Sequence, residues 1–195
     1  RKESDIAVEQ LQRALALDPE DSDARYSLAL ALSQQGRKAE AVAELQQAMK
    51  IAPGSEHAEK LLIQMLSDNK QFDEALTAVA AFEAKYPRSP VPPAYRGAIL
   101  LAQDKRNVDL ARKEYQKALK LDPGYVLAAH NLAKLALDDG KPDEARLYYK
   151  DLLKKRPHDL QTLMALYGLE VKTNHPEQAR QYLATAAEKN PADAG

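Results

Sequence analysis

The stretch AVAELQQAMKIAP, residues 41–53, returns in altered form as ARKEYQKALKLDP, residues 111–123. Both stretches have a small residue, a leucine or tyrosine four positions later, a second small residue and a closing proline. The closing proline recurs at positions 19, 53, 87, 123, 157 and 191, at intervals of 34, 34, 36, 34 and 34 residues. A fixed period of this length is typical of stacked helix–turn–helix units rather than of one globular core.

Each repeat is predicted to contain two helices, because apolar residues recur at three- and four-residue spacing on both sides of a turn. In the first complete repeat we expect helices at about residues 22–35 and 38–51, separated by Gly36 in a left-handed turn. A partial repeat covers residues 1–21, and complete repeats cover residues 22–55, 56–89, 90–125, 126–159 and 160–193. We expect residues 1–195 to form one all-α solenoid of eleven helices, with residues 191–195 as a tail.

Four features depart from the repeat. Lys70 takes the place of the turn glycine, and Phe82 stands where a small residue is usual, so we expect a local change in packing angle. The segment PRSPVPP, residues 87–93, contains four prolines. Proline is tolerated at the start of a helix but not inside one, so we expect a joint within the solenoid here. The two additional residues of the 36-residue interval are expected in the turn DKRNVD, residues 104–109.

The composition excludes several classes of protein. The formal net charge is −1, with both signs interspersed, whereas a nucleic-acid-binding protein is expected to carry a basic excess on one side. Cysteine is absent, which excludes disulfides, thiol catalysis and thiolate metal sites. No apolar run is long enough to cross a bilayer, so we expect no direct membrane insertion. Residues 1–10 lack an initiating methionine and the layout of a signal peptide, and we interpret the sequence as a piece of a longer protein.

These residues resemble the tetratricopeptide repeat family, and the resemblance covers essentially the whole chain. The first complete repeat supplies Leu28-Ala29, Gly36, Ala41, Leu45, Ala48 and Pro53. The fourth supplies Leu132-Ala133, Gly140, Ala145, Tyr149 and Pro157, with Leu152 where a small residue is usual. The family's tryptophan is missing, and its place is taken by Arg25, Glu59, Ala129 and Leu163. The resemblance implies a right-handed superhelical α-solenoid that binds proteins and is not an enzyme.

A narrower resemblance concerns the Pro-rich segment and the phrases AYRGAILLAQ, residues 94–103, and KALKLDPGYVLAAHNLAKLALDDGKPDEARLYYKDLL, residues 117–153. They look like the tetratricopeptide repeat lipoprotein of bacterial exosortase/PEP-CTERM systems, which accompanies exopolysaccharide gene clusters in Gram-negative bacteria. That likeness implies a periplasmic or outer-membrane-anchored scaffold, although the lipobox cysteine of the family does not occur in this sequence. Without that likeness, a cytoplasmic location is equally compatible with the sequence.

The resemblance also implies a binding surface, because the first helix of each repeat lines the concave face of the family's superhelix. In this sequence the groove positions are Tyr26, Leu30, Gln34, Lys60, Gln64, Ser67, Ala98, Leu101, His130, Lys134, Leu137, Met164, Gly168 and Val171. The large apolar members would contact an extended peptide or a helix, and Lys60, Lys134 and His130 would donate hydrogen bonds. The alternative is that several of these side chains pack against neighbouring first helices instead.

Other chemistries find little support. A chaperone-type clamp for a C-terminal carboxylate needs Lys and Asn where the first repeat has Tyr26 and Leu30. Starting from the second repeat, Lys60 and Gln64 fit in part, but Tyr95 and Leu127 then break the set. The four histidines form no pair at i and i+4, so a zinc site fails on ligand count. The Asp-Glu pairs at 73–74 and 143–144 are expected at helix N-termini, where the helix dipole favours negative charge. We therefore expect no catalytic residue, cofactor or metal.

The sequence predicts a non-catalytic scaffold that binds a peptide or protein segment in its concave groove. The alternative is an adaptor region of a larger enzyme or assembly, such as a glycosyltransferase complex. Reading of single-stranded RNA would need a basic, aromatic-rich groove, and the residues at the groove positions do not form one. The sequence leaves the oligomeric state open.

Overall fold

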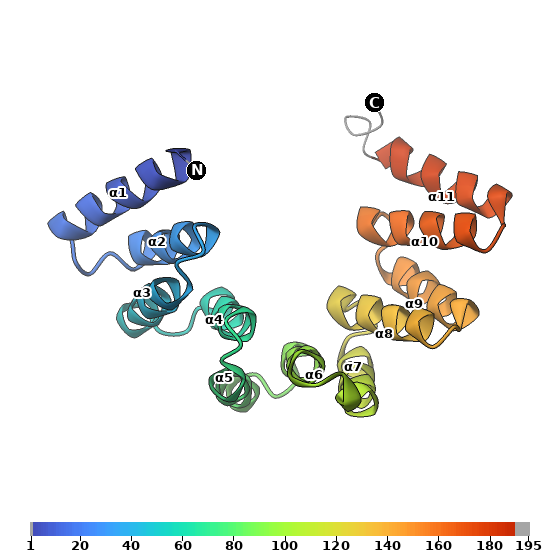
Figure 1. Ribbon diagram of the computed structural model, residues 1–195, viewed down its shortest axis with the longest axis horizontal. Coiled ribbons are helices and arrows are strands. Elements are labelled where there is room, and N and C mark those ends of the chain that lie inside the picture. The colour runs from blue at the N-terminus through green and yellow to red at the C-terminus, as the bar shows by residue number, and fades with distance from the viewer. Residues whose placement is uncertain (1, 190–195) are drawn as a thin grey trace. The chain divides into compact units, whose positions relative to one another are not determined.

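A computed structural model of the chain describes residues 2–189. In these residues the backbone forms eleven α-helices, one short 3-10 helix and no strand (Figure 1). The helices are α1 (Lys2–Leu17), α2 (Ser22–Gln34), α3 (Lys38–Ile51), α4 (Glu56–Asp68), α5 (Phe72–Lys85), α6 (Val91–Gln103), η1 (Lys105–Asn107), α7 (Val108–Leu121), α8 (Val126–Asp138), α9 (Pro142–Lys155), α10 (Leu160–Lys172) and α11 (Pro176–Lys189). The predicted all-α fold is confirmed. Pro191 and the expected tail at 191–195 lie outside the described residues.

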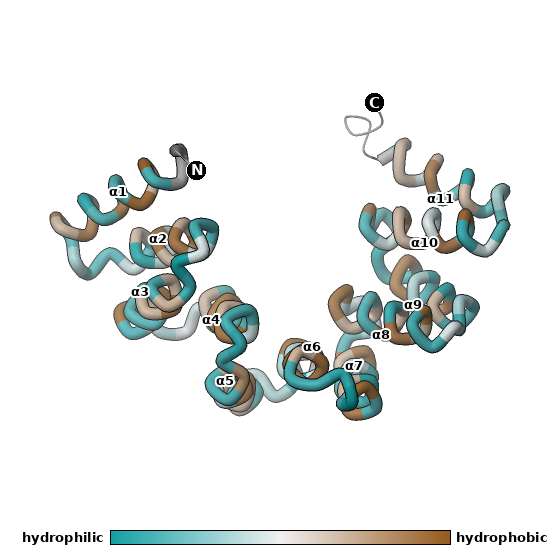
Figure 2. The backbone as a smooth tube through the Cα atoms, viewed as in Figure 1, coloured by the Kyte–Doolittle hydropathy of each residue, from teal (hydrophilic) through white to brown (hydrophobic). Residues whose placement is uncertain are grey.

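The helices stack in sequence order. Contacts join each consecutive pair of helices from α1 to α5 and each consecutive pair from α7 to α11. Figure 2 shows hydrophobic and hydrophilic residues alternating along each helix, as expected when one stripe of a helix is buried. The predicted small residues lie in these contacts, because Ala41, Ala48, Ala111, Ala118 and Ala145 are all buried. The helix–turn–helix solenoid is therefore built as the repeat predicts.

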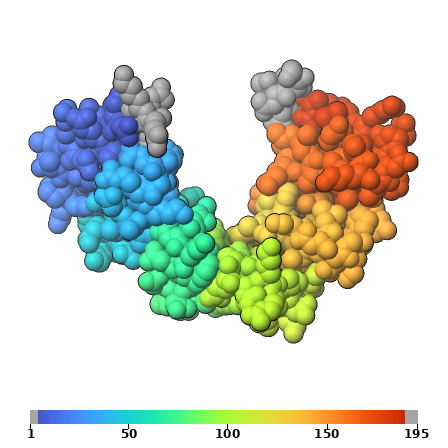
Figure 3. Space-filling model, in the orientation of Figure 1, coloured from blue at the N-terminus to red at the C-terminus, as the bar shows by residue number. Residues whose placement is uncertain are grey.

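The chain separates into two compact units. Unit 1 comprises residues 1–87 with 102–104, and unit 2 comprises residues 88–101 with 105–195. Figure 3 shows the side chains of each unit as a continuous stack, from blue to green in unit 1 and from yellow-green to red in unit 2. The main boundary falls at the start of the Pro-rich segment. The extent of the solenoid as one domain over residues 1–195 stays a prediction.

The Pro-rich segment begins a helix rather than interrupting one. Pro92 and Pro93 occupy the first turn of α6, where a missing N–H costs no helical hydrogen bond. Ser89 supports this start, since its Oγ accepts a hydrogen bond from the Val91 N–H at 3.3 Å. The expectation that these prolines lie at the start of a helix is confirmed, and the joint within the solenoid stays a prediction.

Four residues between paired helices have left-handed backbones. Gly36 and Gly140 have φ of 76° and 73°, while Lys70 and Asn174 take the equivalent place with φ of 62° and 59°. The left-handed residue lets the next N–H return to the preceding helix, as Gln71 N does to Leu66 O at 2.9 Å. The prediction that Lys70 replaces a turn glycine is thus confirmed.

The turn between α6 and α7 accommodates part of the longer interval. It contains η1, and the Asn107 side-chain amide donates a hydrogen bond to the Leu100 carbonyl at 3.0 Å. Four residues, 104–107, separate α6 from α7, against three between α4 and α5, while five residues, 86–90, precede α6, against four between α3 and α4. One additional residue therefore lies in the predicted turn, and the other lies before α6. The change in packing angle expected at Phe82 stays a prediction. Its ring is buried and lies 4.6 Å, centroid to centroid, from that of Tyr86.

Gly97 allows α6 and α7 to approach closely. A Cβ added at Gly97 would lie 3.0 Å from Tyr115 Cε1 and 3.1 Å from the Ala111 carbonyl oxygen. Tyr115 is fully buried, and burial raises the pKa of its phenol. The α6–α7 contact of unit 2 therefore depends on the absence of a side chain at residue 97.

Candidate functional site

The predicted binding residues lie on the first helices of the repeats, which are α2 and α4 in unit 1 and chiefly α6, α8 and α10 in unit 2. They differ in exposure. Leu30, Gln34, Gln64, Lys134, Leu137, Met164 and Val171 are exposed, whereas Tyr26, Lys60, Ser67, Ala98, Leu101, His130 and Gly168 are partly buried. The two units are described separately.

In unit 1 a hollow of about 420 Å³ lies between α2, α3 and α4. Tyr26 is the only predicted residue that lines it, and its other walls are Ser22, Asp23, Ala48, Met49, Ala52, Ser55, His57 and Ala58. His57 and Ser55 were not predicted as binding residues, although His57 precedes Lys60 by three positions and so shares its side of α4. Lys60 forms an ion pair with Glu56, Nζ to Oε1 at 3.0 Å, along the same helix.

In unit 2 two predicted residues meet although they lie on different helices. Leu101 of α6 and Lys134 of α8 line a hollow of about 420 Å³ together with Lys105, Val108, Asn131, Leu135 and Asp138. Leu101 and Ala98 also pack against the buried cluster that contains Tyr115 and Leu132. Ala98 and Leu101 therefore serve the core as well as the face, as the alternative interpretation of the sequence allowed.

His130 joins two first helices. Its Nε2 lies 2.8 Å from Thr162 Oγ1, and its ring meets the Tyr149 ring edge-on at 5.1 Å. Thr162 Oγ1 lies 2.6 Å from the Asp159 carboxylate oxygen, to which the hydroxyl donates. His130 Nε2–H therefore donates to Thr162. Burial lowers the pKa of His130, and the nearby charge of Asp159 opposes that shift only in part.

The exposed apolar residues of the first helices follow a pattern. Leu30, Leu137, Met164 and Val171 expose 37%, 40%, 42% and 54% of their surface. They are all the large apolar side chains that α2, α4, α6, α8 and α10 expose in the described chain, and all four occupy predicted groove positions. The other large apolar side chains on these helices are buried or partly buried.

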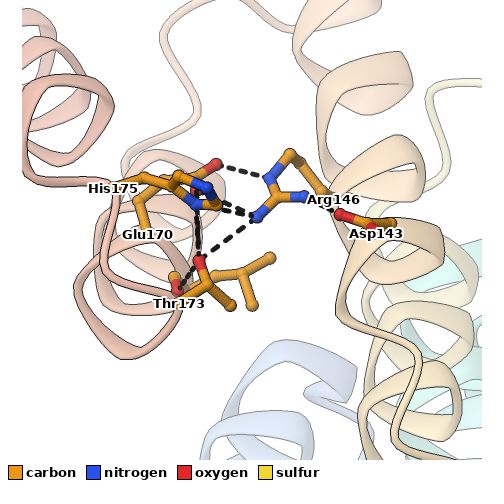
Figure 4. Close-up of polar contacts among 6 residues, drawn as sticks. Asp143, Arg146, Glu170, Thr173 and His175 are labelled. Atoms are coloured by element: carbon orange, nitrogen blue, oxygen red, sulfur yellow. Dashed lines mark hydrogen bonds and ion pairs between the residues drawn. The ribbon is translucent and has the colours of Figure 1, made fainter.

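A buried ionic cluster in unit 2 was not predicted. Arg146 of α9 donates from Nε to Glu170 Oε1 at 2.7 Å and from Nη2 to Glu170 Oε2 at 3.0 Å (Figure 4). The same guanidinium also pairs with Asp143, and Thr173 and His175 complete the cluster on the α10 side (Figure 4). Only 1% of Glu170 is exposed. A sequence signal existed, since Glu170 takes a place that Leu32 and Leu66 hold in the first two complete repeats.

The charge of Glu170 is compensated within the cluster by Arg146 and His175. Burial by itself would raise the pKa of Glu170, but the hydrogen bonds and charges of Arg146 and His175 outweigh it and hold that pKa below its usual value. A hollow of about 250 Å³ lies beside the cluster, lined by Asp143, Arg146, Lys150, Glu170, His175 and Gln178. Because both carboxylate oxygens are already paired, the arrangement ties α9 to α10.

The described residues contain no group of three or more His, Cys, Asp or Glu side chains that could hold a metal ion. None of the helices in residues 2–189 combines the length and apolarity that a membrane span requires.

Comparison with known proteins gives one family. A tetratricopeptide repeat profile matches residues 2–56, 62–126 and 96–160, and a second tetratricopeptide repeat profile matches residues 136–194. Among curated proteins, none matches the sequence significantly.

Several solved structures share the fold. A thermophilic tetratricopeptide repeat protein of Thermus thermophilus aligns with a TM-score of 0.65 and 19% identity, over 88% of this chain and 93% of that one. PilW, a type IV pilus biogenesis factor, aligns with a TM-score of 0.63 and 18% identity, over 98% of this chain and 88% of that one. MamA of Desulfovibrio magneticus aligns with a TM-score of 0.59 and 20% identity, over 80% of this chain and 88% of that one. At these identities the likeness extends to the fold alone.

Proposed function

The chain belongs to the tetratricopeptide repeat family, and on that premise we propose that it is a non-catalytic scaffold in a bacterial envelope or exopolysaccharide system. It binds a peptide or protein segment on the faces of its first helices. In unit 1 this binding face is made by residues of α2 and α4, and in unit 2 by residues of α6, α8 and α10.

One observation supports the binding face above all. Every large apolar side chain that the first helices expose in the described chain lies at a groove position. Fully burying a side chain of this size contributes about 1.5–3 kcal/mol, so covering four that are about half exposed contributes roughly 1 kcal/mol each. Because the helices are already formed, little of this energy is spent on ordering the protein.

The binding face is tested by matched aspartate substitutions. Met164→Asp places a charge on the face of α10, and Leu147→Asp places the same charge on α9, where Leu147 is 61% exposed and off the face. Cross-linking with mass spectrometry in the source organism identifies the partners of the unchanged protein. We expect Met164→Asp to lose those partners and Leu147→Asp to keep them, with equal helicity by circular dichroism. Equal retention by both variants would place the binding surface elsewhere.

The envelope setting is supported by the resemblance of residues 94–103 and 117–153 to an envelope lipoprotein. It is tested separately, by fractionating cells that produce the full-length protein from its own gene. We expect the protein with the envelope fractions. Recovery in the cytoplasmic fraction would contradict the setting while leaving the scaffold function in place.

A further inference from the structure

The faces of α8 and α10 form one surface in unit 2. The hydrogen bond from His130 to Thr162 holds these two first helices side by side. Leu137 follows His130 by seven residues, which is two helical turns, so it lies on the same side of α8. Met164, Gly168 and Val171 are spaced by four and three residues and share one side of α10. We call this surface, made by His130, Lys134, Leu137, Met164, Gly168 and Val171, the α8–α10 face.

Contacts within the chain do not explain why residue 168 is a glycine. A glycine inside a helix is less stable than alanine by roughly 0.5–1 kcal/mol. A Cβ added at Gly168 would meet nothing within 4 Å, whereas a Cβ at Gly97 would collide with Tyr115 and Ala111. Gly97 is thus explained by a neighbouring helix of the same chain. Gly168, between the exposed Met164 and Val171, leaves the α10 backbone open to close approach from outside.

On the α8–α10 face, every side-chain donor apart from Lys134 already has an acceptor within the chain, and so do two donors beside the face. His130 donates to Thr162, Thr162 donates to Asp159, and the Asn131 side chain donates to the Leu127 carbonyl at 2.8 Å. An extended peptide needs partners for its own N–H and C=O groups, because unpaired backbone groups are costly to bury. A helix satisfies those groups internally and presents only side chains. An apolar face with committed polar groups therefore favours a helical partner.

Two lysines without an ion-pair partner among the described residues lie at the edges of the face. Lys134 of α8 and Lys172 of α10 are exposed, and neither forms an ion pair with a residue that the structure describes. Of the acidic residues nearby in sequence, Glu170 is buried with Arg146, whereas Asp138 is exposed and lines the same hollow as Lys134. Two unpaired ammonium groups beside an apolar stripe complement acidic side chains that flank an apolar stripe.

We propose that the α8–α10 face binds an amphipathic helix of a partner protein, whose aliphatic stripe crosses Gly168 and whose flanking acidic residues pair with Lys134 and Lys172. This inference rests on the proposed function, since it names the kind of partner that one part of the scaffold takes. The face of unit 1 is chemically different, because Tyr26, Gln34 and Gln64 offer it hydrogen-bonding groups.

The test uses two displayed peptide libraries on the intact chain. One library holds helices of about 18 residues, or five turns, with aliphatic residues at i, i+3, i+4 and i+7 and acidic residues beside them. The other holds the same residues with alternating pattern and interspersed prolines, which prevents helix formation. We expect enrichment from the helical library only, and we expect the enriched peptides to lose affinity when Lys134 and Lys172 are changed to Glu.

Gly168→Leu separates close helix docking from general stickiness. The added side chain occupies open space, so the fold stays intact, but it obstructs the approaching helix and weakens binding by roughly tenfold or more, as overpacking a close contact does. If the face merely attracts apolar surface, the additional leucine would tighten binding instead. Ala184→Leu on α11 adds the same side chain at an exposed position away from the face and leaves affinity unchanged.

Three results would overturn the inference: enrichment of non-helical peptides, helical peptides that tolerate Gly168→Leu, or no enrichment from either library. None of these affects the proposed function if the partners found in cells still depend on Met164. If cellular partners no longer depend on Met164 but helical peptides still bind the α8–α10 face, the proposed function would be contradicted. The inference that this face binds a helix would then remain.

Discussion

At the scale of single residues, Lys70 occupies a conformation that L-amino acids rarely adopt. Its φ of 62° places it in the left-handed region, where an ordinary side chain costs roughly 1–2 kcal/mol and glycine costs little. Its side chain is exposed, so little packing compensates. We expect Lys70→Gly to raise the free energy of unfolding by about 1 kcal/mol, measured by urea denaturation. Gly36→Lys should lower it by a similar amount, and equal stabilities for all three proteins would contradict this account.

The lowered pKa of His130 makes the stability of unit 2 depend on pH. Burial lowers its pKa in the folded chain, so the unfolded chain binds more protons below the usual pKa of about 6.5. Stability is therefore full above that value and is lost as the pH falls toward the lower pKa of the folded chain. We expect the melting temperature to drop between pH 7.5 and 5.5 and the drop to be smaller in His130→Gln. Parallel drops in both proteins would assign the effect to other groups.

The structural roles of these residues differ in how well the sequence predicts them. The left-handed positions at Lys70 and Asn174 could be predicted, because a turn conformation depends on residues a few positions away. The repeat pattern places Glu170 at a buried position but does not predict its partner Arg146, which lies 24 positions earlier on another helix. The role of His130 likewise depends on Thr162, which is 32 positions away. Sequence periodicity places a residue on a helix face but does not identify its partner.

At the scale of helices, two glycines have opposite effects on stability. Gly97 lies at the α6–α7 contact, where a methyl group would overlap Tyr115 and Ala111. We expect Gly97→Ala to lower the free energy of unfolding by about 1–3 kcal/mol, as overpacking does. Gly168→Ala should raise it by roughly 0.5–1 kcal/mol, because alanine is the better helix former and the added Cβ has room. Thermal unfolding of the two variants measures both changes, and a shared sign would contradict the assignment.

The bounds of the helices could be predicted from the sequence, whereas the hollows between them could not. Prolines, turn residues and apolar spacing define each helix locally, and the predicted bounds of α3 at residues 38–51 agree with the structure. The hollow at Leu101 and Lys134 arises where three segments converge, and its shape depends on Lys105 and Val108 in and after η1. A one-dimensional pattern contains no information on how far apart such segments lie.

At the scale of the whole molecule, the Pro-rich segment coincides with the boundary between the two units. Prolines donate no backbone hydrogen bonds, and few amides in residues 87–93 are protected by a helix. We expect amide hydrogen exchange in this segment to be faster than in α3 or α8, measured by mass spectrometry. Protection as strong as in those helices would show that the boundary does not open more readily than the repeats do.

The Arg146–Glu170 pair constrains how the array could have evolved. Solenoids lengthen by duplicating units, and units with purely apolar contact surfaces can be copied in any order. The fifth repeat is an exception, because a copy placed after a neighbour without that guanidinium would bury an uncompensated carboxylate, at a cost of several kcal/mol. Arg112 and Arg180 hold the place of Arg146 in the third and fifth repeats, whereas Val42 and Leu76 hold it in the first and second. A copy of the fifth repeat would therefore find a compensating guanidinium after the third, fourth or fifth repeat and none after the first or second.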